Sequence, residues 1–258
     1  METNKIYNEN CLDTMAKMPD CFVDLTVTSP PYDSLRTYNG YCFNFESVAK
    51  ELFRVTKQGG VVVWVVGDAT VKGSETGTSF KQALFFKEIG FNLHDTMIYE
   101  KSGVSPATGR YYPAFEYMFI FSKGKPKTFN PILDRKNRWR ERWGKTRVRK
   151  NANGENGKPY ESKIAPEFGM RRNIWQYTQG GGYGADDAIA YKHPAIFPEQ
   201  LVIDHIISWS NEGELVYDPF MGSGTTAKMA LLNNRKFVGS EISNEYCEIA
   251  EKRINENL

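Results

Sequence analysis

Hydrophobic and polar residues follow one another along most of the chain in a pattern typical of alternating strands and helices. Short apolar or β-branched runs predict strands at 24–28, 61–66, 93–99 and 116–121. Apolar residues at three- and four-residue spacing predict a helix over 45–56, which stops before Gly59-Gly60, and a helix over 78–89, which stops at Gly90. The pattern resumes with helices over 198–209, 225–233 and 244–255 and strands over 215–217 and 236–240. This order predicts an α/β fold, a mostly parallel sheet with helices on both faces.

Residues 123–189 interrupt the alternation. They are basic, rich in asparagine and glycine, and show no sustained period. We interpret them as an inserted region of irregular structure, which divides the domain into an N-terminal half, 1–122, and a C-terminal half, 190–258.

Charge is concentrated in that region. The whole chain has a net charge of +2, but Lys123 to Lys150 holds twelve Lys or Arg against two acids, a local +10, so the remainder carries −8 (2 − 10). Such a segment suits a polyanion, although a solvated charged loop is the alternative. Two tryptophans among the arginines favour nucleic acid, because rings and guanidinium planes stack on bases. The residues expected to bind DNA are Arg138, Trp139, Arg140, Arg142, Trp143, Arg147 and Arg149.

Several functional classes are disfavoured by composition. A hydrophobic fraction of 40% and a charged fraction of 25% are ordinary for a soluble globular protein. The four cysteines form no C-x-x-C pair and have no histidine cluster nearby, which argues against a zinc site and a secreted disulfide framework and suits a reducing cytoplasm; we expect no metal. The longest apolar run, 61–66, is too short to span a membrane, and the N-terminus shows no signal peptide.

The segment Asp218-Pro-Phe-Met-Gly-Ser-Gly-Thr-Thr226 follows a predicted strand and opens a predicted helix. Its glycines allow a sharp turn and a close approach to a ligand that faces the helix N–H groups. Glu241 ends the next strand, where nucleotide-binding α/β folds place an acid for ribose hydroxyls. A tight turn that binds nothing is the alternative. The segment lacks the Lys-Ser/Thr ending of a phosphate loop, which disfavours an NTPase.

The second motif is Ser29-Pro30-Pro31-Tyr32, directly after the first predicted strand. The prolines hold the backbone extended and leave the carbonyls of Ser29 and Pro30 free to accept hydrogen bonds. A hydroxyl and carbonyls beside an aromatic ring could bind an amine and stack a planar heterocycle. A proline turn followed by a core tyrosine is the alternative.

Together the two motifs resemble those of the amino-methyltransferases of DNA, which combine a (D/N/S)-P-P-(Y/F/W) tetrapeptide with an F-x-G-x-G cofactor loop. The order here, tetrapeptide, basic region, cofactor loop, looks like the permuted β class. The resemblance covers residues 5–122 and 190–258 and implies a Rossmann-like fold with S-adenosyl-L-methionine as cofactor and double-stranded DNA as substrate. It also implies a target-recognition role for the region between them, a place in a restriction–modification system, and a homodimer as a candidate assembly.

Further segments are similar to that family. Tyr191 to Pro198 resembles its "HPAxFP" element, and Asn10-Cys11 with Asp13 resembles a "GDC" opening that faces the adenine, with Asn10 in place of the usual Asp. The resemblance therefore implies a set of cofactor-binding residues: Asn10, Cys11, Asp13, His193, Phe197, Asp218, Phe220, Gly222, Ser223, Gly224, Thr225, Thr226 and Glu241.

The same resemblance implies methyl transfer to the exocyclic amine of a flipped base, with Ser29 and Pro30 accepting its hydrogen bonds and Tyr32 stacking on it. Ser-Pro-Pro-Tyr is commonest in cytosine 4-amino enzymes and Asp-Pro-Pro-Tyr in adenine 6-amino enzymes, so cytosine is favoured and adenine is the alternative. Carbon-5 methylation is disfavoured because it needs a cysteine nucleophile, usually after proline, and none of the four cysteines follows one.

Two rival functions belong to other classes. A methyltransferase that acts on RNA or on protein glutamine is disfavoured by the motif order, because those enzymes normally place the cofactor loop first. A catalytically inactive DNA-binding module is disfavoured because every motif is intact.

Overall fold

The computed structural model describes residues 1–31, 43–103, 106–138, 146–161, 164–178 and 184–256, which fall into two compact units. The first unit comprises residues 1–130 and 173–258, and the second comprises residues 131–172. Within the described residues, no helix is long and apolar enough to cross a membrane.

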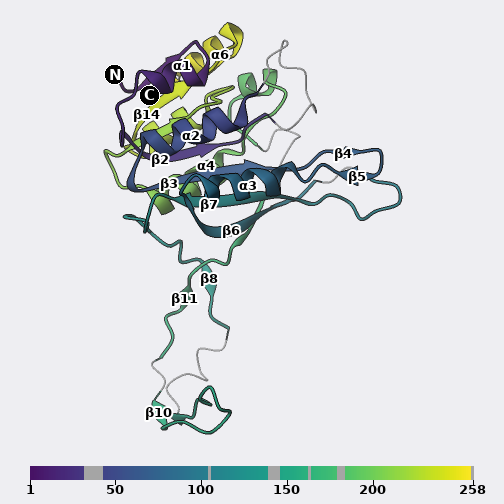
Figure 1. Cartoon of the computed structure of the whole chain (residues 1–258), viewed down its shortest axis with the longest axis vertical. Helices are drawn as coiled ribbons and strands as arrows, with labels where there is room; N and C mark the ends of the chain where they lie inside the picture. Colours follow the sequence, from purple (N-terminus) through teal and green to yellow (C-terminus); the bar gives the residue numbers. More distant parts are fainter. Residues whose placement is uncertain (32–42, 104–105, 139–145, 162–163, 179–183, 257–258) are drawn as a thin grey trace. The chain divides into compact units, whose positions relative to one another are not determined.

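A mixed sheet forms the centre of the first unit (Figure 1), and its eight described strands lie in the order β1-β14-β13-β2-β3-β7-β6-β12. β7 runs antiparallel to both its neighbours, and the other neighbouring strands are parallel. This confirms the predicted α/β fold with a mostly parallel sheet. The strands are β1 (Lys5–Tyr7), β2 (Val23–Thr28), β3 (Thr56–Val66), β6 (Asn92–Lys101), β7 (Phe115–Ser122), β12 (Ile174–Tyr177), β13 (Leu215–Asp218) and β14 (Lys236–Ser240).

Helices cover both faces of this sheet. One face packs against α1 (Cys11–Ala16), α2 (Phe45–Val55) and α3 (Thr78–Glu88). The other carries α4 (Glu199–Trp209), α5 (Thr225–Leu232), α6 (Asn244–Asn255) and a short 3₁₀ helix, η2 (Ala188–Lys192). A small hairpin of β4 (Thr70–Val71) and β5 (Ser74–Glu75) follows β3.

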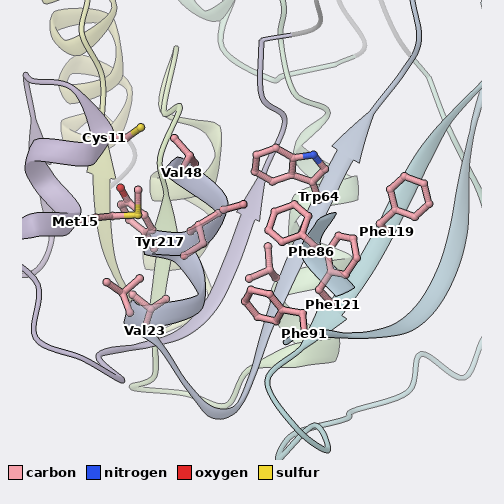
Figure 2. Close-up of a cluster of buried hydrophobic side chains, with 14 of the residues drawn as sticks. Cys11, Met15, Val23, Val48, Trp64, Phe86, Phe91, Phe119, Phe121 and Tyr217 are labelled. Atoms are coloured by element: carbon pink, nitrogen blue, oxygen red, sulfur yellow. The ribbon is translucent and has the colours of Figure 1, made fainter. Parts of the chain in front are cut away.

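The core under α1, α2 and α3 is rich in aromatic rings (Figure 2). Phe86 of α3 stacks on Phe121 of β7 with ring centroids 4.5 Å apart, and Trp64 of β3 contacts Phe86 edge-on. The indole N–H of Trp64 donates to Gln82 Oε1 at 2.8 Å, so the buried tryptophan has its polar atom satisfied. This packing holds β3 and β7 in place. β3 pairs with β2, the strand that leads into the candidate site.

Two strands of the sheet lie outside the predicted elements. β1 pairs in parallel with β14 at one edge, and β12 pairs in parallel with β6 at the other. β12 lies within the stretch 123–189 that was expected to be one insertion, and residues 123–130 also belong to the first unit. The separate unit is therefore narrower than the expected region.

The second unit consists of two short antiparallel pairs, β8 (Arg135–Lys136) with β11 (Phe168–Gly169) and β9 (Thr146–Arg147) with β10 (Tyr160–Glu161). Arg171 Nε donates to Asp134 Oδ2 at 2.7 Å. Several of its apolar side chains are exposed: Leu133, Val148, Ile164 and Met170. Backbone pairing and polar contacts, more than a hydrophobic core, hold this unit together.

The chain leaves and re-enters the first unit at two asparagines. Asn130 Nδ2 donates to Ile207 O at 3.1 Å, and Asn173 Nδ2 donates to Thr96 O at 3.3 Å. Next to them, the Trp209 ring contacts both Phe129 and His94, with centroids 5.0 and 5.5 Å away.

Candidate functional site

The carboxyl ends of β2 and β13 open into one cavity of about 980 Å³. The two strands are parallel neighbours, with Leu25 opposite Val216, so the segments that follow them meet at the same edge of the sheet. Ser29, Pro30 and Pro31 line the cavity after β2, and the loop from Asp218 lines it after β13. The structure thus brings the two sequence motifs together.

Asp218 joins these two segments. Its carboxyl accepts hydrogen bonds from Thr28 Oγ1 (2.6 Å), Thr226 Oγ1 (2.7 Å) and Phe220 N (3.0 Å). Burial raises the pKa of Asp218 to about 6, although the three hydrogen bonds act in the opposite direction. Because Thr28 directly precedes Ser29, the carboxyl holds the proline segment in place beside the start of α5.

The two loop glycines are required for different reasons. Both have a positive φ, +51° at Gly222 and +83° at Gly224. A Cβ on Gly222 would lie 3.0 Å from Nε2 of His193, on the wall of the cavity. A Cβ on Gly224 would lie 2.6 Å from the Cβ of Ala250 in α6, and Gly224 does not line the cavity. Gly222 therefore keeps space for a ligand, whereas Gly224 allows helix packing.

Glu241 follows β14 and lines the same cavity. Its Oε2 accepts from Gly222 N at 2.8 Å, and its Oε1 accepts from Ser243 N at 2.9 Å. Burial raises the pKa of this carboxyl. Each oxygen keeps lone-pair capacity for a further donor, so the side chain is positioned and still able to bind hydroxyl groups.

The segment from Gly184 to Pro198 supplies another wall of the cavity. The His193 ring packs edge-on against Tyr246, with centroids 4.4 Å apart, and the backbone of Ala195 contacts its Nδ1. Phe197 lines the cavity directly before α4.

A buried ionic network lies behind the glycine loop. Arg253 of α6, with no exposed surface, donates to Ser223 O at 2.6 Å and to Glu199 Oε1 at 2.7 Å. Lys228 Nζ contacts Glu199 Oε1 at 3.0 Å and Asp187 Oδ2 at 2.6 Å. The network thereby ties the loop to the wall segment and to α4, and no sequence motif marked it.

The predicted cofactor residues fall into two groups. Most line the cavity: Cys11, His193, Phe197, Asp218, Phe220, Gly222, Ser223, Thr225, Thr226 and Glu241. The other three, Asn10, Asp13 and Gly224, do not. Asn10 caps α1, where its Oδ1 accepts from Leu12 N at 2.9 Å, and Asp13 is exposed on the first turn of that helix.

The remaining predicted residues are less fully described. Arg138, Arg147 and Arg149 are exposed in the second unit. Tyr32, Trp139, Arg140, Arg142 and Trp143 lie outside the residues that the structure describes.

Sequence reasoning missed one wall of the cavity. It consists of Tyr99 and Lys101 on β6 and Glu116 on β7. Lys101 Nζ donates to Glu116 Oε1 at 3.2 Å. These residues lie inside strands and form no local motif, so only the pairing of β6 with β7 brings them together. In the part of the chain that the structure describes, no group of three or more His, Cys, Asp or Glu residues is arranged to hold a metal ion.

Comparison with known proteins defines the class. The N6/N4 methyltransferase family, described as DNA methylase, matches residues 23–252. The orphan methyltransferase M.BamHII of Bacillus amyloliquefaciens is 64% identical over 239 residues, which cover 91% of this chain and 89% of the relative. Among solved structures, the cytosine-N4-specific PvuII DNA methyltransferase has a TM-score of 0.70 at 22% identity, covering 98% of this chain and 86% of the other.

A putative DNA modification methylase of Thermus thermophilus, complexed with S-adenosyl-L-methionine, has a TM-score of 0.66 at 22% identity, covering 98% and 93% of the two chains. The chain therefore belongs to the N6/N4 family of DNA methylases. It is a DNA methyltransferase of the class that modifies the amino group of adenine or cytosine, and the family uses S-adenosylmethionine.

Proposed function

We propose that this chain methylates the exocyclic 4-amino group of cytosine in double-stranded DNA, after the base has flipped out of the helix. The observation that carries this proposal is the meeting of the Ser29-Pro30-Pro31 segment and the Gly222 loop at one cavity. An amine held by the first can thus face a methyl donor held by the second. The cost of flipping, a few kcal/mol, would be offset by contacts in the pocket and along the phosphates.

The residues of the cavity fit S-adenosylmethionine. The volume of the cavity, about 980 Å³, lies at the upper end of the range for small-molecule sites and leaves room for a base beside the cofactor. Glu241 presents a fixed carboxyl for ribose hydroxyls, and Gly222 leaves open the space that a Cβ would fill against His193. When bound, S-adenosylmethionine supplies an electrophilic methyl group on a sulfonium.

Ser29 and Pro30 would prepare the nucleophile. The amine of cytosine is a poor nucleophile because its lone pair is delocalised into the ring. Hydrogen bonds from the amine to Ser29 Oγ and to the Pro30 carbonyl would favour a pyramidal nitrogen and direct its lone pair at the methyl group. In that orientation Ser29 and Pro30 would hold the amine to accept the methyl group, S-adenosylmethionine would supply that group and leave as S-adenosylhomocysteine, and the extra proton would leave the amine afterwards.

We further propose that the basic region binds the DNA duplex and recognises the target site. The exposure of Arg138, Arg147 and Arg149 supports phosphate contacts, with one or two arginines reaching base edges. We also propose a cytoplasmic location, which suits four scattered cysteines that form no C-x-x-C pair in the sequence.

The decisive experiment identifies the product. Plasmid DNA incubated with the protein and S-adenosylmethionine is digested to nucleosides, analysed by mass spectrometry, and sequenced to map the modified site. We expect 4-methylcytosine. 6-Methyladenine would refute the cytosine assignment, and cofactor binding without any methylated nucleoside would favour an inactive DNA-binding module.

A second experiment tests the tetrapeptide. Ser29→Ala and Tyr32→Ala should each severely lower the rate of methyl transfer and leave the affinity for S-adenosylhomocysteine nearly intact, as measured by calorimetry. Ser47→Ala, at a serine on α2 that does not line the cavity, is the matched control and should change neither. If the Ser29 or Tyr32 variant lost affinity and rate in parallel, its residue would belong to the cofactor site instead.

A further inference from the structure

Tyr99 is a buried residue of the cavity wall with an unusual hydroxyl. The side chain is 1% exposed, lies on β6 and lines the cavity. Among the described residues its hydroxyl has no hydrogen-bond partner. Native proteins rarely leave a buried hydroxyl unpaired, because its loss of water is then uncompensated. Burial also raises the pKa of Tyr99, so the hydroxyl stays protonated at neutral pH and remains a donor.

A second donor lies beside it. Lys101 follows two residues later on the same strand, so its side chain lies on the same face of the sheet. Its ammonium is paired with Glu116 at 3.2 Å, and both side chains are largely buried, at 18% and 15% exposure. One of the three N–H bonds serves Glu116, which leaves others for a ligand.

The position of this wall suits a flipped base. Figure 1 shows β2, which precedes Ser29, and β6, which carries Tyr99, in the same sheet. In the sheet order β2-β3-β7-β6 they are three strand spacings apart, about 14 Å. The same cavity reaches both strands. We expect this span to have room for a planar ring between the side chains of the two sides.

We propose that Tyr99 and Lys101 form the wall that binds the ring edge of the target base, with the Tyr99 hydroxyl donating to N3 of cytosine and the Lys101 ammonium to O2. Glu116 holds the ammonium in place. This inference rests on the proposed function, because the 4-amino group must point at Ser29 for N3 and O2 to point at the wall. Beside its amine, cytosine presents two acceptors, N3 and O2, whereas adenine presents one acceptor, N1, followed by a C–H group. The two donors of the wall, Tyr99 and Lys101, therefore favour cytosine.

The test uses Tyr99→Phe on the duplex that contains the mapped target site. We expect kcat/KM to fall roughly 10- to 100-fold, because the N3 acceptor is then buried without a donor. The Tm of the free protein should stay equal or rise, since the change removes an unpaired hydroxyl. If Tyr99 had a structural role only, the Tyr99→Phe substitution would lower kcat/KM and Tm together. The matched control is Tyr117→Phe on β7, whose ring stacks on Phe119 and does not line the cavity; it should leave kcat/KM unchanged.

A modified duplex identifies the partner atom. In a second duplex the target cytosine is replaced by 3-deazacytosine, which carries C–H in place of N3. On this duplex the kcat/KM of the wild-type protein should fall by about the same factor as the Tyr99→Phe substitution lowers kcat/KM on the cytosine duplex. The kcat/KM of Tyr99→Phe should be the same on both duplexes. The double variant Lys101→Met/Glu116→Gln, which removes both charges of this ion pair together, should also lower kcat/KM while Tm is retained.

The inference is overturned if Tyr99→Phe matches wild type on the cytosine duplex, or if its loss is as large on the deaza duplex. A wild-type product of 6-methyladenine refutes the cytosine assignment on which the inference rests, whatever Tyr99→Phe does. A wild-type protein that transfers no methyl group to DNA refutes the proposed function itself, which is a different result from an active enzyme indifferent to Tyr99.

Discussion

Gly224 and Gly73 form a matched pair of positions at which backbone strain and steric clash can be separated. Both have a φ of +83°. Gly73 lies in the β4–β5 turn, where a Cβ would have no neighbouring atom within 4 Å, whereas a Cβ on Gly224 would meet the Cβ of Ala250 at 2.6 Å and its Cα at 2.9 Å. We compare the change to alanine at each position.

The expected magnitudes follow from these contacts. An L side chain in the left-handed region costs about 1–2 kcal/mol, which should be the whole loss for Gly73→Ala. At Gly224 the methyl group also overpacks against a backbone atom that cannot rotate away, which adds about 1–3 kcal/mol. The free energy of unfolding should therefore fall by about 2–5 kcal/mol in Gly224→Ala, the sum of the two costs. The difference between the two variants corresponds to roughly 2–12 °C in Tm.

Urea unfolding of both variants measures this difference. The double variant Gly224→Ala/Ala250→Gly removes the clash. It should recover the share of the unfolding free energy that the clash costs. The Ala250→Gly single variant measures the cost of glycine in the helix, which is subtracted. Gly222→Ala should behave differently, because its methyl group enters the cavity beside His193. It should weaken binding of S-adenosylhomocysteine in calorimetry more than it lowers stability. If Gly224→Ala unfolds with the same free energy as Gly73→Ala, the steric argument is wrong.

Three further predictions concern charge. The pKa of Asp218 is raised from 3.8 to about 6, so its protonated form is favoured by folding, and this stabilisation is present below pH 4 and lost as the pH rises through 6. Asp218→Asn should gain stability over wild type by up to about 3 kcal/mol between pH 4 and 7 in urea unfolding; a difference independent of pH would contradict this. Arg147→Gln and Arg149→Gln should each flatten the salt dependence of binding to target and scrambled duplexes by roughly one log–log unit, as phosphate contacts require, and an unchanged slope in both would remove these arginines from the interface. Arg253→Met should cost about 3–5 kcal/mol of unfolding free energy because it breaks two buried ion pairs and leaves the carboxylates of Asp187 and Glu199 to share Lys228, whereas Lys252→Met, an exposed neighbour on α6, should cost less than about 1 kcal/mol.

The hydrophobic pattern predicted those elements whose apolar content is dense. The run 61–66 lies in β3, and the helical spacing over 78–89 corresponds to α3. β1 was missed because it has three residues, of which Ile6 alone is buried, too few to show a period. β12 was missed because it follows a long polar stretch and is defined by pairing with β6, about 75 residues earlier in the chain.

The candidate site was predictable where it follows strand ends. Segments after parallel strands converge at one edge, so Ser29 and the Gly222 loop could be expected to meet. Tyr99 and Glu116 could not, because they lie within strands, and only the register of β6 against β7 places them opposite each other. Arg253 was not singled out either, since a charged residue in an amphipathic helix normally faces water and here is buried by contacts with other helices.

The two asparagine anchors have an evolutionary consequence. Asn130 and Asn173 bond to backbone carbonyls of the first unit, so the chain leaves and re-enters the catalytic framework at fixed points. Everything between them, residues 131–172, is a single contiguous stretch of gene. Under the proposed role in target recognition, one recombination event at these two codons could replace the recognised DNA sequence and leave the methyl-transfer chemistry untouched. New specificities would then arise by exchange of a cassette, faster than by substitution of one arginine at a time.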